Sequence, residues 1–492
     1  MRTESLTART SPGSPRTSGR AATTPMVSGR VVCGLAGVAV LMASLADAQT
    51  PTQPDQQALN PTQEIAKETP EAAALVAGPT EIRIGGYLGV TGIYRSTSSG
   101  GGTGTSFATI PYGDIAEGHL SETRLSAQAS RLSIRVNAAA AEHRRTLAGY
   151  FEMDFNGTTP GNVAVTTTSV GFRLRNAFGE AQFNRRFLVA AGQAYTLMTP
   201  AKDQLSVWPS DHELTHAVDM NYVAGMVWGR TPQVRFTYRP TTTFNWAVSV
   251  ENPEQQLGDG VVALPRCCAD DLRNQFNTGG NNLTVPNLMP DLVSRVAFNA
   301  GRTFHVDAGG VLRVFRDTLA PYTTSTKQVG GGGSVNARVS VAGMANVIGQ
   351  FAYGAGLGRY IGGLVPDVSV SADGRIHPIH TYSWVGGVEC RLMTRASVAF
   401  YDSGAHADGS YSSDADGTYI GFGYPGAPNT DNTAVHEVTG VFAWQPWKIE
   451  GRGSMQWTTQ FSWVGRTPFS AGASQSSAGS VLFFTQLRYN LP

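Results

Sequence analysis

The feature that most constrains this chain is an alternation of apolar and polar residues that recurs from about residue 82 to the C-terminus. Near the end, Trp457 and Phe461 fall on one parity, whereas Gln456 and Gln460 fall on the other. Side chains of a β-strand point alternately to two faces, so each such strand has one apolar and one polar face. The apolar face is either the core of a soluble β-protein or the lipid-facing surface of an outer-membrane barrel.

The connections between these strands separate the two possibilities. Candidate strands lie near 82–95, 130–139, 144–156, 169–183, 186–197, 230–239, 243–252, 292–300, 303–316, 334–343, 345–354, 378–391, 394–402, 434–445, 450–464 and 479–491. Tight turns near 140–143, 184–185, 240–242, 301–302, 344, 392–393 and 446–448 alternate with long segments near 96–129, 157–168, 198–229, 253–291, 317–333, 355–377, 403–433 and 465–478. Short turns on one rim and long loops on the other are typical of bacterial barrels with an even strand number. The sequence therefore predicts an all-β fold, a transmembrane antiparallel β-barrel of about 16 strands with short periplasmic turns and long external loops.

The N-terminal region carries an export signal. Residues 31–45 form a short apolar run, which is followed by Ala46-Asp47-Ala48, a tripeptide with the small-x-small form of a signal-peptidase site. We expect a signal peptide at 1–48, with Met26 as an alternative start, then a Pro- and Gln-rich periplasmic lead-in at 49–80 and the barrel at 81–492. The predicted location is the bacterial outer membrane.

Composition agrees with a membrane barrel. Charged residues make up 15% of the chain and glycine contributes 57 residues, as expected where a lipid face excludes charge and turns require glycine. A formal net charge of +1 gives no reason to expect a nucleic-acid partner. The three cysteines after residue 48 are odd in number and two of them are adjacent, so they imply no disulfide framework.

If the apolar positions of each strand face lipid, the polar positions face the lumen, and arginine is the commonest charged residue at these positions. The predicted pore-lining and solute-binding residues are Arg131, Arg135, Arg173, Arg175, Arg235, Arg295 and Arg313. A guanidinium group stays charged and offers a planar fork of donors, so rows of arginine along a water-filled wall attract anions. The alternative is that these arginines pair with lumen acids such as Glu152 and Asp154.

The long segment 198–229 is the candidate constriction loop, because the corresponding loop of many sixteen-stranded porins folds inward. Its candidate residues are Asp203, Asp211, His212, Glu213 and Asp219. Acids on an infolded loop opposite an arginine wall would create a transverse field that sorts solutes by charge.

The same segment contains His212-Glu213-Leu214-Thr215-His216, which matches the zincin pattern H-E-x-x-H. That pattern requires a helix, which places both histidines on one face to bind zinc. An alternative function is therefore a surface or secreted zinc hydrolase, and a further one is a non-conducting structural barrel. No nucleophile elbow, phosphate loop or dinucleotide fingerprint occurs, so the sequence calls for no cofactor, no metal and no enzymatic activity.

Several segments together resemble the DcaP-like porin family of outer-membrane channels. They are residues 81–87, 130–135, 172–178, 188–193, 232–236 and 482–489. The resemblance implies a trimeric, sixteen-stranded channel for small anionic solutes such as dicarboxylates, with arginines in its constriction. Two features depart from the family pattern: the chain ends Asn490-Leu491-Pro492 instead of in an aromatic residue, and a Pro-rich stretch replaces the coiled-coil extension of some relatives. The predicted function is passive diffusion of small hydrophilic solutes, and the predicted partners are membrane lipid, small anions and two further copies of the chain.

Overall fold

The computed structural model describes residues 74–78, 80–99, 102–140, 145–157, 171–258, 261–278, 285–362, 364–470 and 477–492. The chain divides into two compact units, Met1–Asp55 and Gln56–Pro492, and all described residues belong to the second. The predicted signal peptide and the predicted lead-in up to residue 73 lie outside the described residues. No helix in the described part of the chain is long and apolar enough to cross a membrane.

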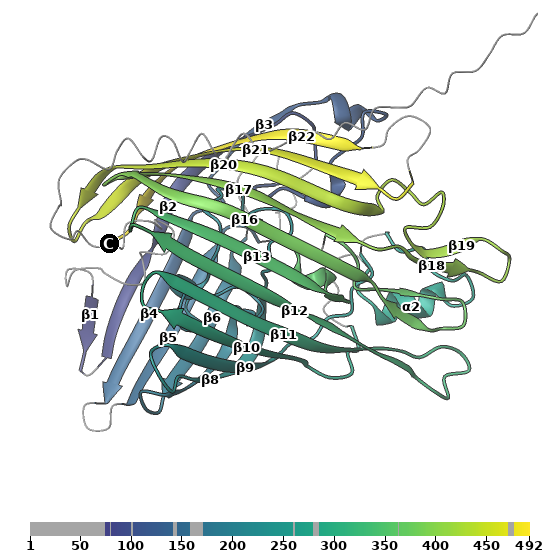
Figure 1. The fold of residues 1–492 in the computed structure, drawn as a ribbon, viewed down its shortest axis with the longest axis horizontal. Helices are drawn as coiled ribbons and strands as arrows, with labels where there is room; N and C mark the ends of the chain where they lie inside the picture. Colours follow the sequence, from purple (N-terminus) through teal and green to yellow (C-terminus); the bar gives the residue numbers. More distant parts are fainter. Residues whose placement is uncertain are drawn as a thin grey trace, which may run out of the picture. The chain divides into compact units, whose positions relative to one another are not determined.

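Antiparallel strands form the wall of a barrel (Figure 1). The described residues contain sixteen barrel strands: β2 (Thr80–Arg95), the interrupted strand β3 (Glu122–Ser126) with β4 (Arg131–Ala140), β5 (Arg145–Asp154), β6 (Arg173–Gln182), β7 (Phe187–Tyr195), β8 (Arg230–Tyr238), β9 (Phe244–Glu251), β10 (Asp291–Ala300), β11 (Phe304–Asp317), β12 (Thr326–Val341), β13 (Ala345–Ala355), β16 (His380–Met393), β17 (Ala396–Ala407), β20 (Asn432–Ile449), β21 (Gly453–Pro468) and β22 (Ala478–Asn490). Each strand pairs with its neighbour in the chain, which confirms the predicted fold class and strand number.

The barrel closes between its first and last strands. Strand β2 pairs with β22 from Tyr87 opposite Asn490 to Arg95 opposite Leu482. On its other side, β2 pairs first with β4 and then with β3, so these two short strands together make one wall position. Ser130 lies between them, where its hydroxyl both donates to the carbonyl of Gly89, at 3.1 Å, and accepts from its N–H, at 3.0 Å. The break in the strand is therefore bridged by a side chain.

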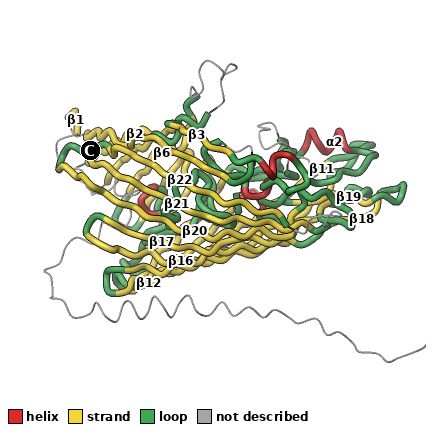
Figure 2. Tube along the Cα trace, turned by 90° about the horizontal axis from the view of Figure 1, so that it is seen from above, coloured by secondary structure: helices red, strands yellow, loops and turns green. Residues whose placement is uncertain are grey.

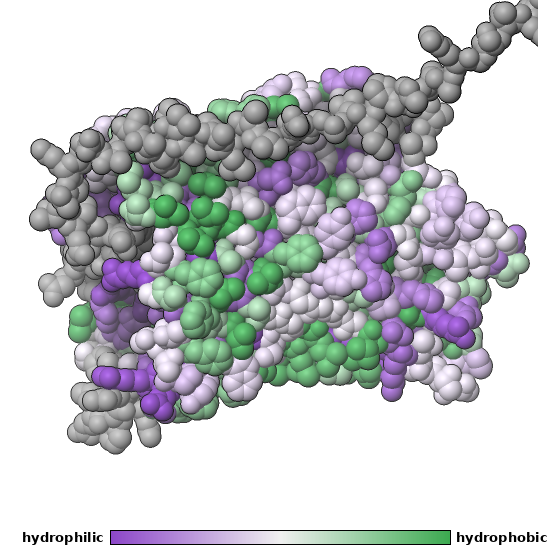
Figure 3. Space-filling view, in the orientation of Figure 1, coloured by the Kyte–Doolittle hydropathy of each residue, from purple (hydrophilic) through white to green (hydrophobic). Residues whose placement is uncertain are grey.

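The two faces of the strands carry the chemistry that their parity predicts. In β10, Leu292, Val296 and Phe298 are exposed, whereas Val293 and Arg295 are almost completely buried. Figure 3 shows one side of the molecule, on which apolar residues (green) gather over the middle of the strands. Exposed apolar side chains on this scale mark a surface that contacts lipid, and the polar parity therefore faces inward.

Short turns join the strands at one end of the barrel and long loops join them at the other (Figure 1). The long-loop end also carries the hairpins β14 (Val368–Val370) with β15 (Ile376–Pro378) and β18 (Ser410–Ser413) with β19 (Tyr419–Phe422), and helix α2 (Ala269–Gln275). Before α2, Cys267 and Cys268 form a disulfide, a bridge between adjacent residues that the cysteine pattern did not predict.

Several boundaries differ from the sequence prediction, among them the end of β3, which lies inside the predicted loop 96–129. The predicted turn at 446–448 belongs to β20, whose register shifts between Trp444 and Trp447, and the turn follows at 450–452. The predicted loop at 317–333 shortens to 318–325, because the glycine run at 330–333 pairs within β12. Ala74–Ala77, expected in the lead-in, forms strand β1 and pairs with the start of β2.

The glycines of β12 lie where the barrel interior leaves no room for side chains. A Cβ atom at Gly330 would lie 2.6 Å from the ring of Phe315, and one at Gly332 would lie 2.7 Å from Leu357. A glycine run usually indicates a turn, but here the missing side chains leave space inside the barrel for Phe315 and Leu357.

Candidate pore site

The segment between β7 and β8 runs inside the barrel and is the core of the candidate site. Main-chain groups of this segment bond to inward side chains of at least six strands. These bonds join Met198 O to Arg295 (β10), Ala201 O to Asn336 and Lys202 O to Arg338 (β12), Glu213 O to Gln350 (β13), His216 N to Tyr401 (β17), Ala224 N to Glu437 (β20), and Val218 N to Gln460 (β21). Figure 2 shows loop segments, in green, enclosed by the strands. Because the six strands lie around the barrel, the segment crosses its interior.

Apolar side chains in the second half of this segment pack against the wall formed by β13, β17 and β20. Leu214, Val223 and Met226 pack with Ile348 of β13 and Val441 of β20 in one buried cluster. At Gly225 the main chain has a φ of 78°, and a Cβ atom there would collide with the main-chain carbonyl of Gly404 in β17. Main chain therefore packs directly on main chain, which only glycine permits.

Three of the predicted arginines hold loops to the wall. Arg235, Arg295 and Arg313 are each about 1% exposed. Arg235 donates to the carbonyls of Tyr195, at 2.6 Å, and Ser206, at 3.0 Å. These side chains have little surface to offer a solute.

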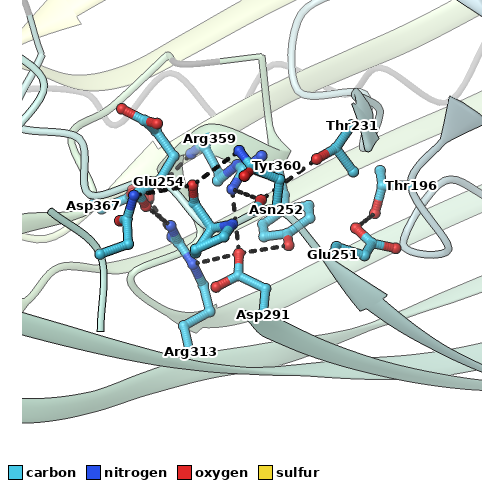
Figure 4. Close-up of polar contacts among 12 residues, drawn as sticks. Thr196, Thr231, Glu251, Asn252, Glu254, Asp291, Arg313, Arg359, Tyr360 and Asp367 are labelled. Atoms are coloured by element: carbon cyan, nitrogen blue, oxygen red, sulfur yellow. Dashed lines mark hydrogen bonds and ion pairs between the residues drawn. The ribbon is translucent and has the colours of Figure 1, made fainter. Parts of the chain in front are cut away.

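Arg295 and Arg313 also pair with buried acids. Arg295 forms an ion pair with Asp307 and donates to the carbonyl of Met198 at 3.0 Å. Arg313 pairs with Asp291 at 3.2 Å and with Asp367, from the loop after β13, at 2.7 Å (Figure 4). In each case an inward arginine joins strands to a loop.

The opposite wall leaves a cleft of about 50 Å³ beside the infolded segment. The wall side is lined by Tyr87 of β2, Arg131 of β4, Arg175 of β6, Ala443 of β20, Gln456 and Thr458 of β21, and Gln486 and Arg488 of β22. The loop side consists of His216, Ala217, Val218, Asp219, Met220 and Tyr222. Arginines, amides and phenols thus face a loop surface that carries one acid.

Two arginines in the cleft approach the same aromatic ring. The guanidinium carbon of Arg131 is 5.4 Å from the ring centroid of Tyr87, and that of Arg488 is 4.9 Å from it. Arg488 bonds to Gln456 at 2.6 and 3.1 Å and forms no ion pair within the described residues. Its charge is therefore not compensated by a direct acidic partner.

Glu152 and Asp154 pair with the other arginines of this wall, namely Arg131 and Arg175 of the cleft and Arg173 outside its lining. Arg175 bonds to Glu152 at 2.5 Å and to Asp154 at 2.9 Å, whereas Arg131 approaches Glu152 only at 3.7 Å. Arg173 makes two bonds to Asp154, at 2.7 and 3.0 Å. On this wall, four arginines including Arg488 face two carboxylates, so the wall keeps an excess of positive charge. Arginine–acid pairing, the alternative weighed from the sequence, is thus widespread but incomplete.

Arg135 lies outside the cleft. Its guanidinium carbon is 4.3 Å from the ring centroid of Trp208, and its Nε donates to Asn137 at 3.0 Å. It thus packs on the infolded segment through an aromatic contact.

The predicted acids of the infolded segment mostly fix its own main chain. Asp211 accepts bonds from the N–H groups of Asp203, Gln204 and Ser206, at 2.7 to 3.1 Å. Asp219 accepts bonds from the N–H groups of Thr105 and Asn221, at 3.1 and 2.8 Å. Burial raises the pKa of both carboxyl groups.

Unlike Asp219, which lines the cleft, Glu213 and Asp203 are not among the residues of the cleft lining. Glu213 forms an ion pair with Arg338 of β12 at 3.3 Å. The carbonyl of Asp203 accepts bonds from Asn245 and Asn299, at 3.0 and 2.9 Å. A transverse field between loop acids and an arginine wall is therefore a poor description of this interior, because the positive wall faces a mainly neutral loop surface.

The H-E-x-x-H segment does not have the geometry that a zinc hydrolase requires. Residues 213–217 have no helical structure, and the ring of His212 packs on Tyr195 at 4.7 Å. His216 instead approaches Glu389 at 3.5 Å. Burial lowers the pKa of His216 to about 4 and that of His212 well below its usual value, so both rings are neutral. The described residues contain no group of three or more His, Cys, Asp or Glu side chains that could hold a metal ion.

Several cleft residues were not among the predicted site residues. Tyr87 and Gln456 have inward parity, and the alternation of β2 and β21 was the signal that marked them. Arg488 shared the inward parity of the predicted arginines. Tyr222, by contrast, lies in the loop with a φ of 63°, and no periodic pattern pointed to it.

The closed sixteen-stranded wall, its apolar exterior and the polar interior with an infolded segment define an outer-membrane β-barrel of the porin type. The fold is similar to that of the outer membrane channel DcaP of Acinetobacter baumannii, with a TM-score of 0.61 and 16% identity over 85% of this chain and 100% of that chain. An anion-selective porin from Comamonas acidovorans matches with a TM-score of 0.46 and 11% identity over 84% of this chain and 100% of that chain. No family model and no curated protein sequence matches the chain. The predicted resemblance to the DcaP-like channels is thus confirmed in the fold.

Proposed function

We propose that this chain forms a passive outer-membrane channel that prefers small hydrophilic anions. The observation that carries the proposal is the cleft in which Arg131, Arg175 and Arg488 face the infolded segment. A guanidinium wall in a confined, water-filled passage raises the local concentration of anions and excludes cations. In this proposal the segment 198–229 is the constriction.

The arginines divide into two roles under this proposal. Arg131, Arg173, Arg175 and Arg488 provide the positive field of the passage. Arg235, Arg295 and Arg313 hold the loops that shape it, through the carbonyl and carboxylate contacts described above. Dicarboxylates are the solutes that the family resemblance implies, and several cationic donors in one cleft suit a ligand with two carboxylates.

The proposed assembly is a homotrimer, as the family resemblance implies. Chemical cross-linking of the protein extracted in mild detergent tests this directly. A ladder that stops at three subunits is expected, and a species that remains monomeric at every reagent concentration would contradict it.

A non-conducting structural barrel is the second candidate, and the small volume of the cleft favours it. Planar-bilayer recordings of the purified full-length protein separate the two. Discrete conductance steps are expected, with a reversal potential under a tenfold KCl gradient that has the sign of chloride preference. A barrel that inserts without any conductance would favour the structural candidate, and a reversal potential of potassium sign would refute the anion preference.

A further inference from the structure

A second pocket lies where the infolded segment meets two other loops. It has a volume of about 300 Å³ and is separate from the arginine cleft, with no lining residue in common. Its walls come from residues 105–108 after β2, from residue 221 and several residues of 223–229 in the infolded segment, and from Arg359, Ile361, Gly362 and Leu364 after β13. All three segments belong to connections at the long-loop end of the barrel.

The lining of this pocket differs from that of the cleft. Its apolar and aromatic side chains are Phe107, Ala108, Val223, Met226, Trp228, Ile361 and Leu364. Arg359 is the one charged residue in the lining, and Ser106 and Asn221 add neutral polar groups. Pockets for small molecules are mostly apolar, with a few placed polar groups that orient the ligand, and their volumes begin at about 300 Å³.

One edge of Arg359 is fixed by the protein. Its Nη1 donates to Asp291 at 3.3 Å and to the carbonyl of Asn252 at 2.8 Å, and its main-chain N–H donates to Asp367 at 3.1 Å (Figure 4). The guanidinium carbon is 5.3 Å from the ring centroid of Tyr360. Its Nε and Nη2 make no hydrogen bond to any other described residue.

The side chain of Arg359 is therefore held in place while donors remain for a ligand. The side chain is 18% exposed, and Arg359 is one of the residues that line the pocket. A carboxylate that bonds to a fixed arginine loses less conformational freedom than one that must order a flexible side chain.

We infer that this pocket binds a small monocarboxylate with an aromatic ring, such as phenylacetate. The carboxylate would bond to Arg359, and the ring would contact Phe107, Trp228 and Met226. A dicarboxylate would have to place its second charge against apolar side chains, where no described cation lies in the lining, and that costs free energy. The inference rests on the proposed function, because the pocket would bind anions at the long-loop end before they enter the passage.

Binding calorimetry on the full-length protein in detergent micelles tests the inference without relying on conductance. The probes are phenylacetate, acetate without the ring, 2-phenylethanol without the charge, and succinate with a second carboxylate. Phenylacetate is expected to bind at least about tenfold more tightly than each of the other three, because it alone satisfies both the guanidinium and the apolar wall. Equal or tighter binding of succinate or acetate would overturn the inference.

Two variants and a control locate the binding site. Arg359→Gln is expected to weaken phenylacetate binding about tenfold or more, the typical loss for a charge-assisted hydrogen bond. Gly229→Leu fills the pocket from another element: a Cβ atom there would have only Thr196 Cγ2 within 4 Å, at 3.7 Å, so the main chain tolerates it. Arg375→Gln, on an exposed loop arginine outside the pocket, is expected to leave binding unchanged.

The outcomes separate this inference from the proposed function. Unchanged phenylacetate binding in both Arg359→Gln and Gly229→Leu would overturn the pocket, even if the channel prefers anions. Conversely, phenylacetate binding that both variants weaken, in a protein that conducts no ions, would support the pocket and overturn the passive channel.

Discussion

Two groups of inward arginines in this barrel have the same parity but different surroundings. Arg235, Arg295 and Arg313 are buried against loop carbonyls and acids, whereas Arg131 and Arg488 line an open cleft on the wall formed by β2, β4, β21 and β22. Strand parity decides that both groups face the interior. The path of the loops decides whether a guanidinium holds the structure together or meets a solute.

The difference also concerns how the positive charge is compensated. A buried ion pair adds little net stability compared with apolar packing, but removal of one partner leaves an uncompensated charge in a poorly hydrated site. Among the cleft arginines, the side chain of Arg131 is 15% exposed, and Arg488 bonds to the neutral side chain of Gln456. Substitutions in the two groups should therefore affect different properties, namely stability in the first group and ion preference in the second.

The largest expected effect is on stability, from Arg313→Met. Asp367 and Asp291 would lose the guanidinium that lies 2.7 and 3.2 Å away, at a cost of about 3–5 kcal/mol in the free energy of unfolding. Guanidinium chloride unfolding in micelles, followed by circular dichroism, measures the change. Arg375→Met removes an exposed arginine that pairs with Asp373, and little change is expected there. Equal losses in both variants would remove the distinction between buried and exposed arginines.

A smaller effect is expected from Gly225→Val, a substitution that should push the infolded segment away from strand β17. A β-branched residue at a φ of 78° carries strain of about 1–3 kcal/mol, and its Cβ atom collides with the carbonyl of Gly404. The segment should move away from β17, so we expect the single-channel conductance to rise. Gly349→Ala is the control, because no atom lies within 4 Å of a Cβ atom there. If the conductance of Gly225→Val matched that of the control, the segment would not be the constriction.

Asp431 extends the comparison to the acids, because it is a buried carboxylate for which the described residues provide no ion pair. It accepts the N–H of Gly423 at 2.8 Å in the loop before β20, and burial raises its pKa to about 6. Because the folded state binds this proton more tightly than the unfolded chain, whose aspartate pKa is about 3.9, stability is highest below that value. It falls as the pH rises to about 6 and then levels off.

The loss across this range should be roughly 1–2 kcal/mol, and Asp431→Asn should abolish it. Unfolding midpoints of the wild type and the variant at pH 4.5 and pH 7.5 measure the effect. A wild type that gains stability relative to the variant as the pH rises would contradict the assignment.

The strands of this barrel could be predicted from sequence because lipid and water impose a period of two on every strand. Trp457 and Phe461 are exposed and Gln456 and Gln460 are buried, as their parity requires. The prediction was wrong at the glycine run of β12, because glycine at a turn and glycine beside a protruding Phe315 look alike in sequence.

The roles of individual arginines could not be predicted in the same way. Arg295 and Arg131 have the same parity, but only the path of the infolded segment brings the carbonyl of Met198 to Arg295 and leaves Arg131 in the cleft. The pairing of Asp211 and Asp219 with main-chain N–H groups likewise depends on loop conformation. Long-range contacts of irregular segments leave no periodic signal.

The central claim is that the cleft arginines, and not the exposed charge of the external loops, set the ion preference. The most direct measurement is the reversal potential under a KCl gradient for the wild type, Arg131→Gln/Arg488→Gln and Arg375→Gln. We predict chloride preference in the wild type and in Arg375→Gln, and a potential shifted toward zero or beyond in the double variant. A double variant with the reversal potential of the wild type would contradict the account.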